Sequence, residues 1–207
     1  MGNGTVLRKV QSRPRKGLAF FLGFLRGPKS VGSVIPSSRF LEQRIVDVAG
    51  IANAKVVVEL GPGTGGTTRA ILDALPSNGR LLAIEVDPEF VSLLKAEPDA
   101  RLIVHHGSAE QIGDILRSYG LSSPDAVVSG IPFSTMPDDL GIRILREVWA
   151  CLNPRGRFIA YQFRSRVGQL GRRLFGQPEV ELEVLNAPPM RVYRWQKRHL
   201  AAAAESA

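Results

Sequence analysis

The chain has 207 residues, 44% of them apolar, a formal net charge of +8, three histidines and one cysteine, Cys151. Its length and apolar content suit a single domain with a well-packed core. One cysteine excludes an internal disulfide, and with three histidines the chain lacks a metal-ligand cluster. We therefore predict no bound metal and a reducing, cytoplasmic setting.

The charge is unevenly distributed along the sequence. Residues 1–44 carry nine Lys and Arg against one acid, residues 45–154 carry eight basic and fourteen acidic residues, and residues 155–198 carry ten basic residues against three glutamates. Basic ends thus flank an acidic middle. This distribution predicts an anionic partner surface, which is either a membrane or a nucleic acid.

The basic N-terminal region contains a short apolar run, Leu18–Leu25, followed directly by Arg26. A run of this length cannot cross a bilayer, which takes about twenty residues in a helix, and no small-residue cleavage site of a secretory signal follows it. Two interpretations remain open: an amphipathic helix that lies in a membrane interface, or a cap over the domain. We assign residues 1–44 to this membrane-binding or capping segment.

A helix is predicted next in the chain. Ser37 or Ser38 can cap its start, and Gly50 ends it. Its buried stripe comprises Phe40, Leu41, Ile45 and Val48.

The stretch from Val56 to Gly66 is predicted to be the centre of the fold. Consecutive valines indicate a buried parallel strand, and an acid, a proline and four glycines follow it. Thr67 is expected to cap a helix after this loop. Glycines let the backbone approach a ligand closely, and a helix start offers unpaired N–H groups. Together these features predict a nucleotide-binding corner.

Strands and helices alternate after this corner. Strands are expected at 81–87, 102–106, 126–128 and 158–163, with helices from Pro88, over 109–119 and over 138–152. Alternating runs at 179–184 and 192–195 predict an antiparallel hairpin at the edge of the sheet. The pattern predicts an α/β fold with a mostly parallel, doubly wound sheet over residues 45–198, followed by a flexible tail at 199–207.

The acid at the end of the first strand favours one of two kinds of nucleotide site over the other. Gly61, Gly63 and Gly66 satisfy a dinucleotide pattern, but the carboxylate of Glu59 would repel a pyrophosphate and suits a sulfonium or an ammonium. The order Glu-x-Gly-x-Gly-x-Gly from Glu59 to Gly65 resembles the first motif of class I S-adenosylmethionine-dependent methyltransferases. The resemblance implies their Rossmann-like fold with a seven-stranded sheet, and S-adenosylmethionine as cofactor.

The resemblance also implies which residues hold the cofactor. Glu85, at the end of the second strand, is placed to bind the ribose hydroxyls. The full implied set is Glu59, Gly61, Gly63, Thr64, Gly65, Glu85, Val86, Ser108, Ala109 and Ser129.

The loop Ser129–Phe133 follows the fourth strand and resembles the loop that holds the acceptor nitrogen in amino-methylating enzymes. The resemblance implies that Ser129 and Pro132 orient the amine and that the rings of Phe133 and Tyr161 offer cation–π contacts to it.

Several short segments make the resemblance more specific. They are Phe24–Gly32, Pro36–Arg39, Glu59–Gly65, Ser129–Phe133 with Met136–Pro137, and Pro188–Pro189 before Tyr193. In this order they resemble the bacterial soluble phospholipid N-methyltransferases that methylate phosphatidylethanolamine, and the related ornithine-lipid N-methyltransferases. The resemblance implies a phospholipid acceptor, an anionic membrane partner and a peripheral location on the inner face of the plasma membrane. It makes Arg39, Arg191 and Tyr193 candidates for the lipid phosphate. Phe133 departs from the leucine expected at its position.

Two other readings compete with lipid methylation. The rRNA adenine dimethyltransferases share the Glu-x-Gly-x-Gly-x-Gly start, but they have Asn where this chain has Ser129-Gly130, and they have a C-terminal helical domain for which few residues remain here. Nucleic acid is therefore the less favoured partner. A membrane- or RNA-binding module with a vestigial cofactor fold is disfavoured by the intact glycine loop and its two acids.

Overall fold

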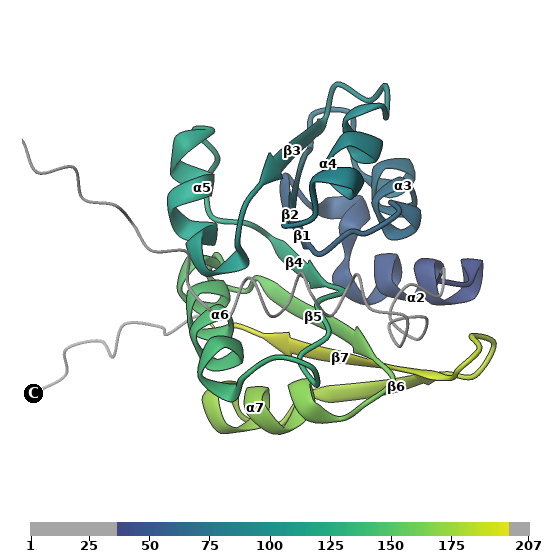
Figure 1. Cartoon of the computed structure of the whole chain (residues 1–207), viewed down its shortest axis with the longest axis vertical. Coiled ribbons are helices and arrows are strands. Elements are labelled where there is room, and N and C mark those ends of the chain that lie inside the picture. The colour runs from purple at the N-terminus through teal and green to yellow at the C-terminus, as the bar shows by residue number, and fades with distance from the viewer. Residues whose placement is uncertain (1–36, 199–207) are drawn as a thin grey trace, which may run out of the picture.

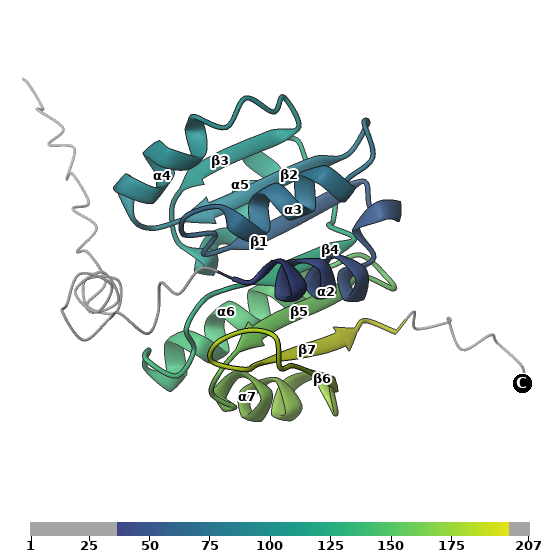
Figure 2. The same cartoon turned by 90° about the vertical axis from the view of Figure 1, so that its right-hand side faces the viewer.

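The fold is a seven-stranded sheet with helices on both faces (Figures 1 and 2). A computed structural model describes residues 37–198. The predicted apolar run at 18–25 and the predicted tail at 199–207 lie outside the described residues. Within residues 37–198, no helix has the length and apolar character needed to span a bilayer.

The strand order confirms the predicted fold class. The strands are β1 (Val56–Leu60), β2 (Arg80–Glu85), β3 (Leu102–His106), β4 (Ala126–Ser129), β5 (Arg157–Gln162), β6 (Glu179–Glu183) and β7 (Met190–Gln196). They are arranged in the order β3-β2-β1-β4-β5-β7-β6. β1 to β5 are parallel, whereas β7 runs antiparallel to both β5 and β6. Because β1 lies between β2 and β4, the winding reverses there, and the carboxyl ends of these strands form the crevice in which such sheets bind ligands.

The helices divide between the two faces. They are α2 (Arg39–Ala49), α3 (Gly66–Ala74), α4 (Pro88–Lys95), α5 (Ile112–Ser118), α6 (Asp138–Cys151) and α7 (Arg166–Phe175), with short 3₁₀ turns η2 (Ile51–Asn53) and η3 (Ala109–Gln111). α2, α3 and α4 lie on one face, and α5, α6 and α7 on the other.

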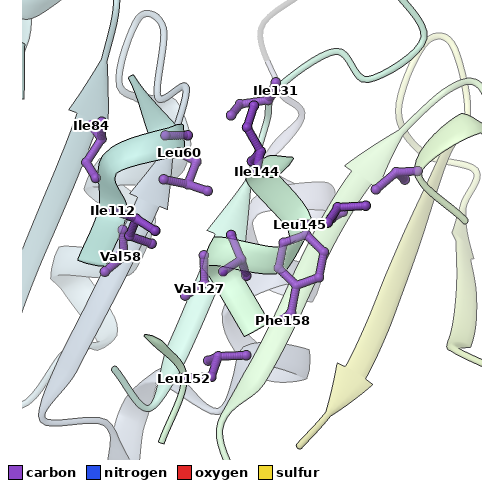
Figure 3. Packing of buried hydrophobic residues seen from close by; sticks show 14 of the residues in the cluster. Val58, Leu60, Ile84, Ile112, Val127, Ile131, Ile144, Leu145, Leu152 and Phe158 are labelled. Carbon is purple, nitrogen blue, oxygen red and sulfur yellow. The ribbon is translucent and has the colours of Figure 1, made fainter. Parts of the chain in front are cut away.

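Apolar strand residues pack against both helical layers. Figure 3 shows Val58, Val127 and Phe158 of the sheet facing Ile112 and Leu145 of α5 and α6. All five are fully buried, and each such side chain contributes about 1.5–3 kcal/mol relative to exposure. This packing fixes the strand ends, which carry the site residues.

Helix α2 crosses the predicted domain boundary between residues 44 and 45. Ser38 caps it by accepting a hydrogen bond from the amide of Leu41, and Gly50 ends it at a φ of 70°. Leu41 and Ile45 lie in the same core cluster at 1% and 0% exposure. The first turn of α2 therefore packs in the same core as the rest of the helix.

Helix α7 was not predicted from the sequence. Its Gly168 and Gly171 lie directly over the rings of Tyr193 and Trp195, where an added Cβ would come within 2.5 and 2.4 Å of ring carbons. Glycines disfavour helices, so the close packing of α7 on the sheet, rather than local propensity, stabilises it.

The alternating pattern in β6 has an unexpected orientation. Glu183 is buried and accepts a hydrogen bond from Nε of Arg44 on α2 at 2.8 Å, while Val180 and Leu182 are 48% and 53% exposed on the other face. The apolar side chains of this edge strand are thus open to solvent, and Glu183 is its one buried residue.

Candidate active site

The glycine loop forms the turn between β1 and α3. Gly61, Gly63 and Gly65 have φ values of 69°, 55° and 82°, in the left-handed region that glycine adopts without strain. The N-cap of α3 is Gly65, not Thr67 as predicted, because α3 begins two residues earlier than expected, at Gly66. Thr64 is exposed at the top of the loop. The loop thus turns sharply at the carboxyl end of β1.

Glu59 is fully buried beneath this loop. Its Oε2 accepts a hydrogen bond of 2.6 Å from Oγ1 of Thr68, and its Oε1 has no hydrogen-bond partner within the described residues. Burial raises the pKa of Glu59 to about 7, against the opposing effect of the Thr68 hydrogen bond. An unpartnered buried acceptor of this kind suits a cationic donor such as an ammonium.

Glu85 links the end of β2 to the glycine loop. Its Oε1 accepts hydrogen bonds from the amides of Val86 and Asp87 at 2.7 and 3.0 Å, and its Oε2 accepts one from Gly63 at 3.2 Å. Burial raises the pKa of Glu85 and these backbone bonds oppose the shift. A carboxylate has about four lone-pair positions, so acceptor capacity for a ribose hydroxyl remains.

A third acid near the loop was not singled out from the sequence. Glu42 of α2 reaches the start of α3, where its Oε1 would lie 2.6 Å from a Cβ added at Gly66. Burial raises the pKa of Glu42 and nearby Arg69 opposes the shift. The glycine at position 66 therefore makes room for a carboxylate at the helix start, where negative charge is favoured.

The end of β3 contributes a turn of small residues. Oγ of Ser108 accepts a hydrogen bond of 3.3 Å from the amide of Glu110 and so caps η3, and Ala109 is buried behind it. Nε2 of His106 lies 3.1 Å from the carbonyl oxygen of Val86, which joins the ends of β2 and β3.

The loop after β4 packs directly on the glycine loop. Ser129 is fully buried, and its Oγ accepts a hydrogen bond of 3.4 Å from the amide of Ile131. A Cβ added at Gly130 would lie 2.6 Å from Oη of Tyr161 and 2.9 Å from the carbonyl oxygen of Gly61. Only glycine fits this backbone contact, which brings the two loops together at the ends of β1 and β4.

Comparisons with known proteins agree with this geometry. Residues 57–156 match a family model described as a methyltransferase domain. The ornithine lipid N-methyltransferase of Singulisphaera acidiphila is 34% identical over 182 residues, which cover 86% of this chain and 95% of that protein. The chain belongs to the class I S-adenosylmethionine-dependent methyltransferases.

More distant relatives share parts of this methyltransferase. The ribosomal RNA small subunit methyltransferase A of Leifsonia xyli is 30% identical over 151 residues, which cover 67% of this chain and 49% of that protein. The O-methyltransferase from Bacillus cereus, solved in complex with SAH, has a TM-score of 0.64 at 14% identity and covers 91% of this chain and 94% of that one. The latter likeness confirms the Rossmann-like fold.

The residues of the methyltransferase fit its cofactor, S-adenosylmethionine. The unpartnered Oε1 of Glu59 can accept from the cofactor's ammonium, and Glu85 retains room for a ribose hydroxyl. Among the residues that the structure describes, no other side chain lies within 4 Å of the Cβ position at Gly63, so this part of the loop leaves room for a ligand. Within residues 37–198, no cluster of three or more His, Cys, Asp or Glu could hold a metal ion.

Two aromatic residues of the predicted acceptor site are buried. Phe133 is 1% exposed and packs with Met136 and Leu140 in the core, so its ring does not face an open acceptor site as predicted. Tyr161 is 9% exposed, and its hydroxyl lies 3.3 Å from Oγ1 of Thr67 and against Gly130. Burial raises the pKa of Tyr161, and the nearby Glu59 raises it further. Tyr161 therefore presents a neutral hydroxyl to the loop.

Gln162, the last residue of β5, is a buried polar contact of this loop that the sequence did not reveal. It is 6% exposed, and its Nε2 donates a hydrogen bond to the carbonyl oxygen of Ile131. Its Oε1 has no hydrogen-bond partner within the described residues. A glutamine at the end of an apolar strand carries no sequence signal of this role.

The three candidates for the lipid phosphate are not brought together. Arg39 is exposed at the start of α2, with its guanidinium 4.9 Å from the centre of the Phe40 ring. Arg191 lies at the start of β7, and Nη1 donates a hydrogen bond of 2.8 Å to the carbonyl oxygen of Phe163. Tyr193 is 4% exposed because α7 covers it, and burial raises its pKa. Tyr193 is therefore a core residue, whereas Arg191 lines a surface pocket.

Proposed function

We propose that this methyltransferase transfers the methyl group of S-adenosylmethionine to the amine nitrogen of a membrane lipid headgroup. The proposed acceptor is phosphatidylethanolamine, methylated stepwise toward phosphatidylcholine. The similarity to a lipid N-methyltransferase over 95% of that protein's length supports a lipid acceptor.

The observation that carries this proposal is the lack of room for a side chain at Gly130. The rRNA adenine dimethyltransferases that this chain resembles have an asparagine in this loop. Here the hydroxyl of Tyr161 and the carbonyl oxygen of Gly61 occupy the positions that a side chain at residue 130 would need. The loop therefore offers Tyr161 and backbone groups to the acceptor, which suits a small amine better than an adenine.

The buried polar atoms at the end of β5, beside the loop, suit an amine as the methyl acceptor. An ammonium group must lose one proton before its nitrogen can attack, and alignment supplies most of the remaining catalysis. The cofactor supplies an electrophilic methyl group on its sulfonium. Gln162 Oε1 and the neutral hydroxyl of Tyr161 are acceptors that orient the amine through its hydrogens.

Ornithine-lipid N-methylation is a second candidate. The relative from Singulisphaera acidiphila carries that name and aligns over 86% of this chain. Both acceptors present a primary amine near an anionic group on an amphiphile, so the same loop chemistry serves either.

The charge of the N-terminal segment supports a place at a membrane. Residues 1–44 hold nine basic residues and one acid, next to the apolar run Leu18–Leu25. We infer peripheral binding to the inner face of the plasma membrane, where anionic lipids attract basic segments by about 1 kcal/mol per residue near the surface.

A labelling experiment tests the proposal. The protein is incubated with methyl-labelled S-adenosylmethionine and either total lipid or total RNA. We expect label in the lipid fraction, and purified phosphatidylethanolamine and ornithine lipid then identify the acceptor. Label confined to RNA would overturn the proposal.

A further inference from the structure

A surface pocket adjoins the acceptor loop on the α7 face of the sheet. It has a volume of about 590 Å³ and is lined by three arginines, Arg164, Arg166 and Arg191, together with Ser134, Ser165 and Phe163. Ser134 directly follows the acceptor loop residue Phe133, and the segment from Phe163 directly follows Gln162 at the end of β5. Residues of the pocket therefore directly follow, in the sequence, both segments that form the proposed amine site.

The pocket has an excess of positive charge. Arg166 is paired with Asp138, with 3.0 Å between Nε and Oδ1, and its Nη1 donates to Oε1 of Gln169 at 3.0 Å. Arg164 and Arg191 have no carboxylate partner within the described residues. Two uncompensated guanidiniums beside two serine hydroxyls form a donor-rich site that suits an oxyanion.

Apolar side chains border the same pocket. Phe163 lines it and is 53% exposed. Leu182, also 53% exposed, is the cross-strand partner of Arg191 in the β6–β7 pair, so both side chains lie on one face of the sheet. The next turn adds Val184 and Leu185 at 62% and 60% exposure. An oxyanion site bordered by exposed apolar residues suits an amphiphile rather than a free anion.

We propose that this pocket binds the oxyanion of the lipid acceptor, with Arg164 and Arg191 as its ligands and the acyl chains leaving over Phe163 and Leu182. The inference rests on the proposed function and names the headgroup class. With the oxyanion on these arginines, the amine would lie toward the acceptor loop and the buried acceptors Gln162 Oε1 and Tyr161 Oη, so the site would select a zwitterionic headgroup. The oxyanion is either a phosphodiester or a carboxylate, which the test distinguishes.

The test compares three soluble acceptors with similar alkyl chains. Dihexanoyl phosphatidylethanolamine carries a phosphodiester, N-hexanoyl ornithine carries a carboxylate, and octylamine carries no oxyanion. The variants are R164Q/R191Q and the charge-conserving R164K/R191K. The control is R173Q, because Arg173 is an exposed arginine of α7 outside the pocket.

We expect R164Q/R191Q to raise KM for the preferred oxyanion-bearing acceptor about 10- to 100-fold, through loss of charge-assisted hydrogen bonds, with kcat within about twofold. The KM of R164Q/R191Q for octylamine should stay at the parent value. The KM and kcat of R173Q should equal those of the parent for all three acceptors. R164K/R191K should recover most of the affinity for the oxyanion-bearing acceptor. The acceptor with the lower KM in the parent identifies the oxyanion. An unchanged KM in R164Q/R191Q, or an equal loss for octylamine, would overturn the inference.

A binding measurement separates this inference from the proposed function. If the parent methylates none of the lipids, the proposed function fails, and calorimetric titration with dihexanoyl phosphatidylethanolamine and N-hexanoyl ornithine still tests the pocket. Weaker binding to R164Q/R191Q supports the pocket, whereas equal binding, or no binding by the parent, overturns it. Should the double variant fail to fold, R164Q serves alone, since Arg164 makes no hydrogen bond or ion pair within the described residues.

Discussion

Three glutamates bring negative charge to the glycine loop from three different elements. Glu42 comes from α2, Glu59 from β1 and Glu85 from β2, and burial is the main cause of the raised pKa of each. In Glu85 backbone amides compensate the carboxylate, whereas in Glu59 one oxygen has no partner within the described residues. The buried carboxyl of Glu59 thus has an acceptor position that suits the cationic amine of the cofactor.

Glu59 should make cofactor binding depend on pH. With a pKa of about 7, its ionised fraction rises from about 0.1 at pH 6 to about 0.9 at pH 8, so the affinity for S-adenosylhomocysteine should rise about tenfold over this range. Calorimetric titration at several pH values measures it. The amine of S-adenosylhomocysteine titrates as well, and the E59Q variant corrects for this contribution. E59Q should bind the ligand weakly, and its affinity should change less with pH than that of the parent. The same slope in E59Q would contradict a role for Glu59.

Glu85→Ala should weaken S-adenosylmethionine binding by about 1–3 kcal/mol, because charge-assisted hydrogen bonds to the ribose are lost. Glu89→Ala is the matched control, since Glu89 is an exposed acid in the first turn of α4. Calorimetry on folded variants measures both. Unchanged affinity in Glu85→Ala would exclude Glu85 as the ribose ligand.

At the scale of elements, the packing of α7 decides which residues face the acceptor. Its glycines let it lie against Tyr193 and Trp195, whose rings stack at a centroid distance of 5.9 Å, and this buries Tyr193 away from any lipid. The same helix places Arg166 in the surface pocket that Arg164 and Arg191 also line.

Gly113 of α5 and Gly171 of α7 offer a matched pair of substitutions. Gly171→Ala should lower the free energy of unfolding by about 1–3 kcal/mol, because its Cβ would overpack against Trp195, which stacks on Phe158. Gly113→Ala meets nothing closer than 3.6 Å and should raise that free energy by up to about 1 kcal/mol. Urea unfolding of both variants measures the difference. Equal effects would mean that α7 does not pack as closely as described.

Local sequence patterns were sufficient for the sheet but not for α7. The apolar run of β1, the Asp87-Pro88 start of α4 and the Ser38 cap of α2 each carry their own signal, so their positions were predicted. The helical pattern of α7 has glycines where apolar residues are expected, and those glycines make sense only once Tyr193 and Trp195 are in place beneath them. For the same reason the burial of Phe133 and Tyr193 and the role of Gln162 could not be predicted, because they depend on contacts between distant segments.

In the whole molecule, the basic regions near the two ends of the sequence have different proposed roles. The C-terminal basic region supplies the pocket arginines Arg164 and Arg191, beside the exposed apolar residues of the β6 edge. The N-terminal basic region is the proposed membrane anchor, and its charges would act together with the apolar run Leu18–Leu25.

Deleting residues 1–26 should abolish sedimentation with anionic vesicles and leave cofactor binding intact. Substituting Phe20, Phe21 and Phe24 with Ser should reduce vesicle binding even at low salt, because burial of apolar surface is not screened by ions. An RNA-binding segment would instead lose affinity steeply with salt and depend little on these phenylalanines. Vesicle binding by the triple variant equal to that of the parent would contradict an interfacial helix.

The bond of 2.8 Å between the amide of Ser38 and Oδ1 of Asn186 fixes where the chain enters the domain. Asn186 lies in the turn between β6 and β7, at the same end of the sheet as the end of β5, so the chain enters the domain at the strand ends that carry the site residues. Ten residues separate Arg26 from Ser37, and a chain of that length reaches at most about 36 Å. A domain tethered through its N-terminal segment would stay within that reach of a lipid surface between turnovers, at a high effective concentration of acceptor. Successive methyl transfers to one nitrogen would then form a processive series on the surface instead of separate encounters from solution.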